Sequence, residues 1–210
     1  MTGLAAAVAL SGCGSGSRQD VNEPAGKFPV QVTTASFPTF QRLAQHTHLV
    51  ISVRNSGSKT IPNLAVTICN TTCTYPAPVG QGTSVGSFDQ YLYGSELASH
   101  SRPVWVVDRP PGLCGYSCLN GGQGANVSAA SNTWQAGPVK PGATATFNWA
   151  VTAVAPGKHV VAWQVAAGIY GKAKAVLADG SIPSGTFAVS ISRTPGLTHV
   201  NDAGRVVTGP

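Results

Sequence analysis

The sequence predicts an all-β protein, a sandwich of antiparallel β-sheets, and three observations carry this prediction. Apolar and polar residues alternate in many short stretches, as expected for strands with one face against a core. The 210 residues include 25 glycines and 15 prolines, which favours many turns over long helices. Trp149 and Trp163 fall on the inward parities of two successive predicted strands, which implies a thick core between two sheets.

Composition and charge narrow the function classes. Hydrophobic residues make up 42% of the chain and charged residues 10%, so the chain can bury a substantial core. The 13 Lys+Arg against 7 Asp+Glu give a net charge of +6, spread along the chain without a basic run. Nucleic-acid-binding proteins cluster their cations, so no nucleic-acid partner is expected. A spread positive charge instead favours anionic envelope polymers or lipid headgroups.

The N-terminal residues have the pattern of a targeting signal. Leu4–Leu10 is an apolar run too short to span a bilayer, which needs about 20 apolar residues. It leads into Leu10-Ser11-Gly12-Cys13, which resembles the lipobox of bacterial lipoproteins. The resemblance implies a signal peptide at 1–12, cleavage before Cys13, and a diacylglyceryl lipid on the Cys13 thiol. Met1-Thr2-Gly3 lacks the usual basic residues, so the start of this signal peptide is expected to be truncated.

A flexible tether is expected at 13–26, because Gly14–Asp20 is rich in glycine and serine. Such a segment suits the interval between a lipid anchor and a folded domain. The sandwich is predicted over 27–193 and begins with a strand in which Phe28, Val30 and Val32 share one face. Pro29 within that strand indicates a sheet edge.

The best-defined strands come in three pairs. Leu49, Ile51 and Val53 share a face, and Asn55-Ser56-Gly57 supplies a turn toward a return strand. The inward residues of that return strand are Leu64, Val66 and Ile68. Residues 141–168 predict a β-hairpin around the turn Ala155–Lys158, and 172–177 and 186–192 predict a further strand pair. Residues 194–210 are expected to form a loosely held tail.

These strand and turn patterns resemble the immunoglobulin-like domains of the CARDB kind, named for cell adhesion in bacteria. The resemblance covers residues 28–68 and 132–193. It implies an immunoglobulin-like β-sandwich on the cell surface, without catalytic residues to carry over. Adhesion or ligand binding is the function expected by analogy.

Residues 69–131 depart from that pattern as a long, loop-rich insertion, in which Pro103–Asp108 is expected to add a strand. Insertions of this length are usually pinned or functional. The cysteines of its two Cys-x3-Cys motifs are Cys69, Cys73, Cys114 and Cys118. In an oxidising compartment they are expected to form two disulfides, and three connectivities are open.

Metal handling is the alternative use of these cysteines. Their spacing can hold copper or zinc, and His46 and His48 on one strand face could add ligands. However, no histidine follows Cys73 at the spacing of a binuclear copper site, and the single methionine is Met1. No metal and no other cofactor is therefore predicted.

Ligand binding is assigned to aromatic residues of the insertion: Tyr91, Tyr93, Trp105 and Tyr116. Exposed aromatic residues among glycine and serine make adaptable contacts with sugars or proteins, although the same residues could instead pack the insertion onto the sandwich. Gly82-Thr83-Ser84-Val85-Gly86 has the form of a hydrolase nucleophile elbow. Prolines and glycines flank it where that motif needs a strand and a helix, so no catalysis is expected.

The sequence thus predicts a lipid-anchored extracytoplasmic binding or adhesion module that is not an enzyme. Its expected partners are the membrane, through Cys13, and an envelope polysaccharide or protein. An envelope metal-handling protein and an accessory subunit of an envelope complex are the alternatives.

Overall fold

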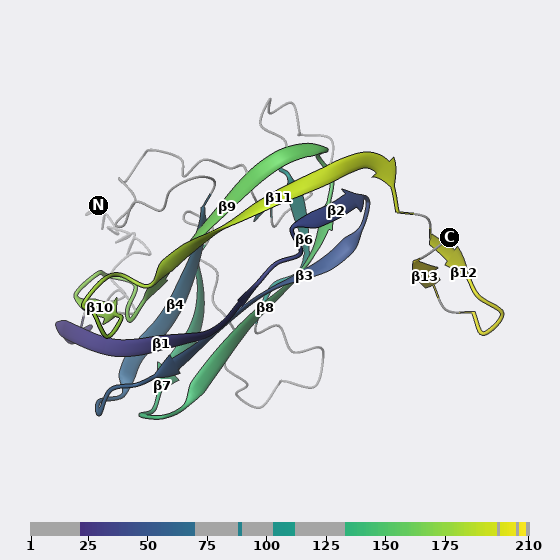
Figure 1. Ribbon diagram of the computed structural model, residues 1–210. Coiled ribbons are helices and arrows are strands. Elements are labelled where there is room, and N and C mark those ends of the chain that lie inside the picture. Colours follow the sequence, from purple (N-terminus) through teal and green to yellow (C-terminus); the bar gives the residue numbers. More distant parts are fainter. Residues whose placement is uncertain are drawn as a thin grey trace, which may run out of the picture.

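A computed structural model of the chain (Figure 1) describes residues 22–69, 88–89, 103–111, 133–196, 198–204 and 206–208. Within these ranges the regular structure is all strand. The first strands are β1 (Gly26–Ser36), β2 (Phe40–Leu43), β3 (His46–Asn55), β4 (Ile61–Cys69), β5 (Phe88–Asp89) and β6 (Trp105–Arg109). They are followed by β7 (Thr133–Val139), β8 (Thr144–Ala153), β9 (Gly157–Ala166), β10 (Ala173–Val176), β11 (Ser184–Pro195), β12 (Thr198–Val200) and β13 (Val206–Thr208). The described residues contain no helix suited to crossing a membrane.

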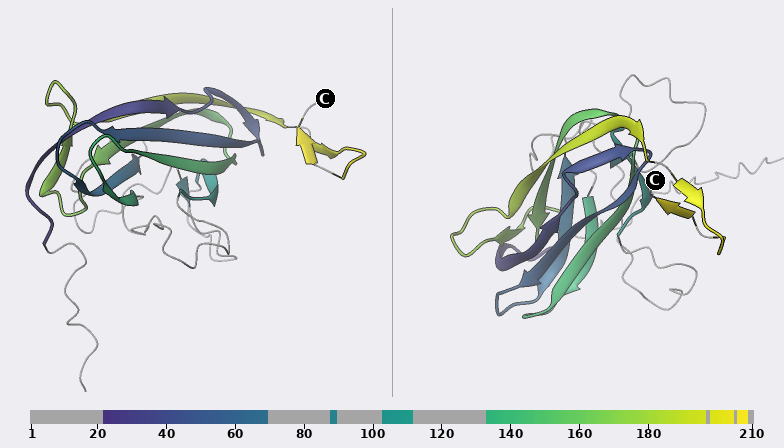
Figure 2. Two further views of the ribbon diagram at one scale, coloured as in Figure 1. Left: turned by 90° about the horizontal axis from the view of Figure 1, so that it is seen from below. Right: turned by 45° about the vertical axis from the view of Figure 1, so that its right-hand side comes forward.

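The strands form two facing sheets. One has the order β10-β1-β3-β8-β6-β5 and the other the order β2-β11-β9-β4-β7. Figure 2 shows them as two layers, with the β12–β13 hairpin beyond the end of β11. The order β1-β3-β8 against β11-β9-β4-β7 corresponds to strands A-B-E and G-F-C-C′ of an immunoglobulin-like sandwich, and β6, which precedes β7 in the chain, adds a strand beside β8. The predicted immunoglobulin-like β-sandwich is confirmed.

The core lies between the sheets and follows the alternation in the sequence. The fully buried inward residues of the central strands include Leu49, Ile51, Val53, Leu64, Val66, Trp149, Val151 and Val161. All four tryptophans have at most 6% of their surface exposed. The inward faces predicted for β3, β4, β8 and β9 are therefore confirmed.

The predicted pairing of neighbouring strands is wrong in three places. The hairpin expected over 141–168 does not form, because β8 pairs with β3 and β6, whereas β9 pairs with β4 and β11 in the opposite sheet. At the end of β8, the Val154 N–H donates to the Val104 carbonyl at 2.8 Å, which keeps this end of the strand beside β6. The next residues then cross to the other sheet.

The other two pairs fail in the same way. β3 and β4 lie in different sheets, as do β10 and β11. Alternation shows which residues point into the core, but a sandwich has two sheets whose inward faces look alike in sequence. Local periodicity therefore cannot choose between a hairpin partner and a strand across the core.

The connection between β1 and β2 links the two sheets. β1 pairs antiparallel with β3, and after Phe37 the chain crosses to the other sheet, where β2 runs parallel to β11. Pro29 is not at an open edge, because the short strand β10 covers Gly26–Pro29 in parallel register. Beyond Pro29 no described strand lies on the outer side of β1.

Two segments outside the three predicted strand pairs also form strands. Pro103–Asp108, expected to add a strand, contributes β6, which pairs with β8. In the expected tail, β12 and β13 pair antiparallel with each other. Figure 1 places this yellow hairpin at the end of the molecule opposite the start of β1.

Candidate binding site

Most of the predicted site residues lie outside the described residues. These are Cys13, Cys73, Tyr91, Tyr93, Cys114, Tyr116 and Cys118, together with Ser84 of the G-x-S-x-G segment. Cys69 ends β4 and is disulfide-bonded. The connectivity of the remaining cysteines stays a prediction.

Trp105 belongs to the core and not to an exposed surface, so its assignment to ligand contact is wrong. Its side chain is fully buried, and its Nε1–H donates to Oε1 of buried Gln41 at 2.7 Å. The ring packs 5.2 Å from Phe37 and 5.8 Å from His159, measured between ring centroids. A buried tryptophan satisfies its N–H in this way. Trp105 thus anchors β6 to β2 across the sandwich.

His46 and His48 lie on the outer face of β3, but each makes its own local contact. The Nδ1 of His46 is 3.1 Å from Oδ2 of Asp108, and the Thr152 hydroxyl donates to the same carboxylate at 2.7 Å. The Nδ1 of His48 is 2.8 Å from Oδ1 of Asn148. Within the described ranges no cluster of three His, Cys, Asp or Glu side chains could hold a metal ion. The arrangement is that of a hydrogen-bonded outer sheet face.

A groove of about 410 Å³ lies between β7 and β8 on the described surface, and we call it the β7–β8 groove. Its lining comprises Pro111, Gln135, Ala136, Pro138, Val139, Lys140, Ala143, Thr144, Ala145, Thr146 and Phe147. Small apolar side chains and two threonines predominate. The groove follows the seam where the two sheets face each other.

Two strand edges border this groove. β7 pairs with β4, and no described strand lies along its other edge. β6 pairs with β8 only at Ala150–Ala153, so the residues before Ala150 have β3 on one side and no described strand on the other. Such edges present backbone N–H and C=O groups that can add a further strand. Pro138 removes one donor from the β7 edge, a usual way to limit uncontrolled pairing.

Asn55 holds the turns at one end of the groove. Its buried Nδ2 donates to the carbonyls of Lys59 at 2.9 Å and Val139 at 2.8 Å, and its Oδ1 accepts from the Gly57 N–H at 3.0 Å. Its backbone also bonds to Gly142 and Ala143 in the β7–β8 turn. The sequence predicts the turn at Asn55 but gives no sign of this role, which depends on residues far along the chain.

Glu23 fixes the start of the domain. Its buried carboxylate accepts the N–H groups of Tyr170 at 2.7 Å and Ala173 at 2.6 Å. Gly168 packs against this carboxylate, and an added Cβ there would lie within 2.5 Å of its oxygens. A side chain at position 168 would therefore push the Glu23 carboxylate away from the two N–H groups that it accepts. The sequence shows Glu23 only as a polar residue in the expected tether, so its role was missed.

Comparisons with known proteins give no family. No family model matches the chain, and no curated protein matches it. Among solved structures, Salmonella α2-macroglobulin mutant Y1175G is 11% identical with a TM-score of 0.39, over 81% of this chain and 7% of that chain. Native Escherichia coli α2-macroglobulin is 12% identical with a TM-score of 0.39, over 83% and 8%. PapD-like domain 7 of human CEP192 is 9% identical with a TM-score of 0.36, over 89% and 98%.

This chain thus spans less than a tenth of the length of the α2-macroglobulins that it resembles. Identities and TM-scores this low carry no argument about function. The strand order of the two sheets is what identifies the chain as an immunoglobulin-like β-sandwich.

Proposed function

We propose that this chain is a non-catalytic binding module of the bacterial cell envelope, and that it binds an extended polypeptide segment in the β7–β8 groove. One observation carries the proposal: the groove runs along edges of β7 and β8 to which no described strand is hydrogen-bonded. An extended segment can pair its backbone with such an edge, while the lining side chains select its residues. A surface protein or another subunit of an envelope complex would supply the segment.

The lining of the groove favours a polypeptide over a polysaccharide. Sugars are commonly bound on exposed aromatic rings, and the aromatic residue among the lining residues, Phe147, has only 1% of its surface exposed. The other apolar lining residues are alanines, prolines and a valine. These suit the side chains of an extended peptide.

The proposed location rests on the N-terminal sequence. Leu10-Ser11-Gly12-Cys13 resembles a lipobox, which would place a lipid on Cys13 and the sandwich on the extracytoplasmic face of the membrane. The disulfide at Cys69 agrees with an oxidising compartment. The strand patterns that resemble CARDB domains agree with an adhesive role on the surface.

Site-specific photocrosslinking in the producing cells tests the groove. We expect a photoreactive amino acid at Ala145, which lines the groove, to form a covalent adduct whose added mass is removed by protease and not by polysaccharide hydrolases. The matched control places the same group at Thr186 on β11, in the sheet opposite β8. Equal adducts at both positions, or an adduct digested only by polysaccharide hydrolases, would contradict the proposal.

A further inference from the structure

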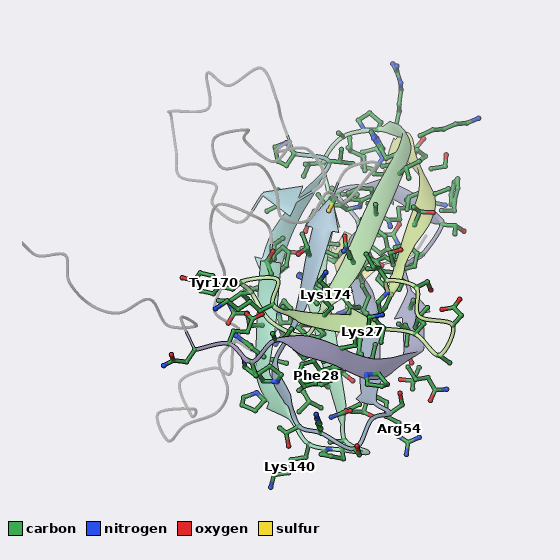
Figure 3. All side chains as sticks on the ribbon, turned by 90° about the vertical axis from the view of Figure 1, so that its left-hand side faces the viewer. Lys27, Phe28, Arg54, Lys140, Tyr170 and Lys174 are labelled. Carbon is green, nitrogen blue, oxygen red and sulfur yellow. The ribbon has the colours of Figure 1, made fainter. Side chains whose placement is uncertain are left out.

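Exposed cations gather at the end of the sandwich where β1 begins. They are Lys27 on β1, Arg54 at the end of β3, Lys140 in the β7–β8 turn and Lys174 on β10, and we call this set the basic end. Figure 3 looks onto this end and shows Lys27 and Lys174 on neighbouring strands, with Arg54 and Lys140 lower in the view. The basic end is assembled from four strands and turns that are far apart in the sequence.

Two of these lysines lie in direct register. β1 and β10 pair in parallel, with Lys27 opposite Lys174, and Phe28 and Ala175 point into the core on the alternate positions. Both lysine side chains therefore lie on the same outer face. Like charges directly opposite on neighbouring strands repel each other and lower stability. An anion that bound here would relieve this repulsion.

No described carboxylate forms a salt bridge with either lysine of this pair. Among the described residues, the contact with salt-bridge geometry joins His46 Nδ1 to Asp108 Oδ2, and neither Lys27 nor Lys174 makes such a contact. Glu23 is buried and accepts two backbone N–H groups. Asp179, in the β10–β11 loop, accepts hydrogen bonds from the hydroxyl and the N–H of Ser181. These hydrogen bonds, and above all the one from the hydroxyl, lower the pKa of the Asp179 carboxyl.

The chain also enters the domain at this end. Glu23 fixes the residues before β1 to the β9–β10 loop and to the first residue of β10, and Cys13 lies ten residues earlier in the sequence. Ten residues span about 35 Å at full extension. A lipid on Cys13 would therefore hold the basic end close to the membrane surface. Tyr170, 38% exposed and labelled in Figure 3, adds an amphipathic ring of the kind enriched at membrane interfaces.

We infer that the basic end docks on anionic phospholipid headgroups and so orients the sandwich on the membrane. The inference rests on the proposed lipid anchor for its location, but the charge pattern that carries it is independent of that anchor. A membrane is favoured over a soluble anionic polymer because the anchor and the cations share one end of the domain. Docking would add an electrostatic contact to the lipid, and two linked contacts bind more tightly than either alone.

Vesicle sedimentation tests the docking surface without the lipid. We expect the full chain with Cys13→Ser to bind phosphatidylcholine vesicles containing 30% phosphatidylglycerol far better than pure phosphatidylcholine vesicles. Binding to the pure phosphatidylcholine vesicles measures how much the apolar residues 4–10 contribute to membrane binding. Adding Lys27→Gln and Lys174→Gln should weaken binding to the anionic vesicles about 25-fold, or about fivefold per lysine. Raising the salt to about 1 M should remove the preference, because screening shortens to about 3 Å.

The matched control removes two cations from the opposite end, Lys158→Gln and Arg193→Gln, and should leave binding nearly unchanged. An equal loss in both double variants, or no preference for anionic vesicles, would overturn the inference and leave the proposed anchor untouched. A loss of heparin binding with vesicle binding intact would overturn it in favour of a soluble anionic polymer.

A charge reversal separates docking from folding. Lys174→Glu places an opposite charge beside Lys27, so it should raise the unfolding temperature while it lowers binding to the anionic vesicles. Reduced binding in a more stable protein cannot come from unfolding. Unchanged binding in this variant would also overturn the inference.

Discussion

Replacing Trp149 with alanine is expected to lower the free energy of unfolding by about 3–5 kcal/mol. Trp149 is fully buried on β8, and its ring packs edge-to-face on Trp134 of the opposite sheet at 5.3 Å between centroids. It also stacks on Phe147 at 5.9 Å. The substitution removes contacts that join the two sheets and leaves a cavity. Urea unfolding, followed by circular dichroism, measures the loss.

Trp149→Phe is the matched control. The Trp149 Nε1 is buried without a hydrogen-bond acceptor among the described residues. Phenylalanine keeps an aromatic ring and removes this unsatisfied donor, so a loss of only about 1–2 kcal/mol is expected. An alanine variant as stable as the phenylalanine variant would mean that Trp149 does not join the sheets.

Replacing Asn55 with alanine is expected to cost about 2–4 kcal/mol. The side chain satisfies the Lys59 and Val139 carbonyls and the Gly57 N–H, and alanine would leave all three without this partner. A smaller side chain cannot replace these bonds, and the Val139 carbonyl bond is buried. Thermal unfolding measures the effect.

The neighbouring substitution Ser56→Ala is the control for Asn55. Ser56 is exposed, and its backbone N–H donates to the Pro29 carbonyl, which alanine preserves. A change within about 0.5 kcal/mol is expected. If both variants lost the same stability, the three side-chain bonds of Asn55 would not hold this end of the sandwich together.

The sequence predicts the strands of this fold better than their partners. The inward parity of Leu49, Ile51 and Val53 is a local property, so it appears in any sandwich with that strand. The side of the core on which a strand lies depends on distant pairing, such as β3 with β8. The hairpin predicted around Pro156 failed for this reason.

The proposed functional features also divide into those set by a local sequence motif and those set by pairing between distant strands. The stretch Leu10–Cys13 that resembles a lipobox is contiguous, so the proposed lipid anchor follows from the sequence alone. The basic end and the β7–β8 groove are formed by residues distant in sequence, and Lys27 meets Lys174 only through the parallel pairing of β1 with β10. For Trp105 the prediction from the sequence was wrong. Its place in a loop-rich insertion suggested an exposed side chain, whereas the structure buries it in the core.

The central claim is that this sandwich is held on a membrane through Cys13, and the intact mass of the mature protein from its native membrane tests it most directly. The sample is alkylated with and without prior reduction. The account predicts a chain that begins at Cys13 with a diacylglyceryl mass, and alkylation of the other four cysteines only after reduction. A chain that retains residues 1–12 with an unmodified Cys13 thiol would contradict the account.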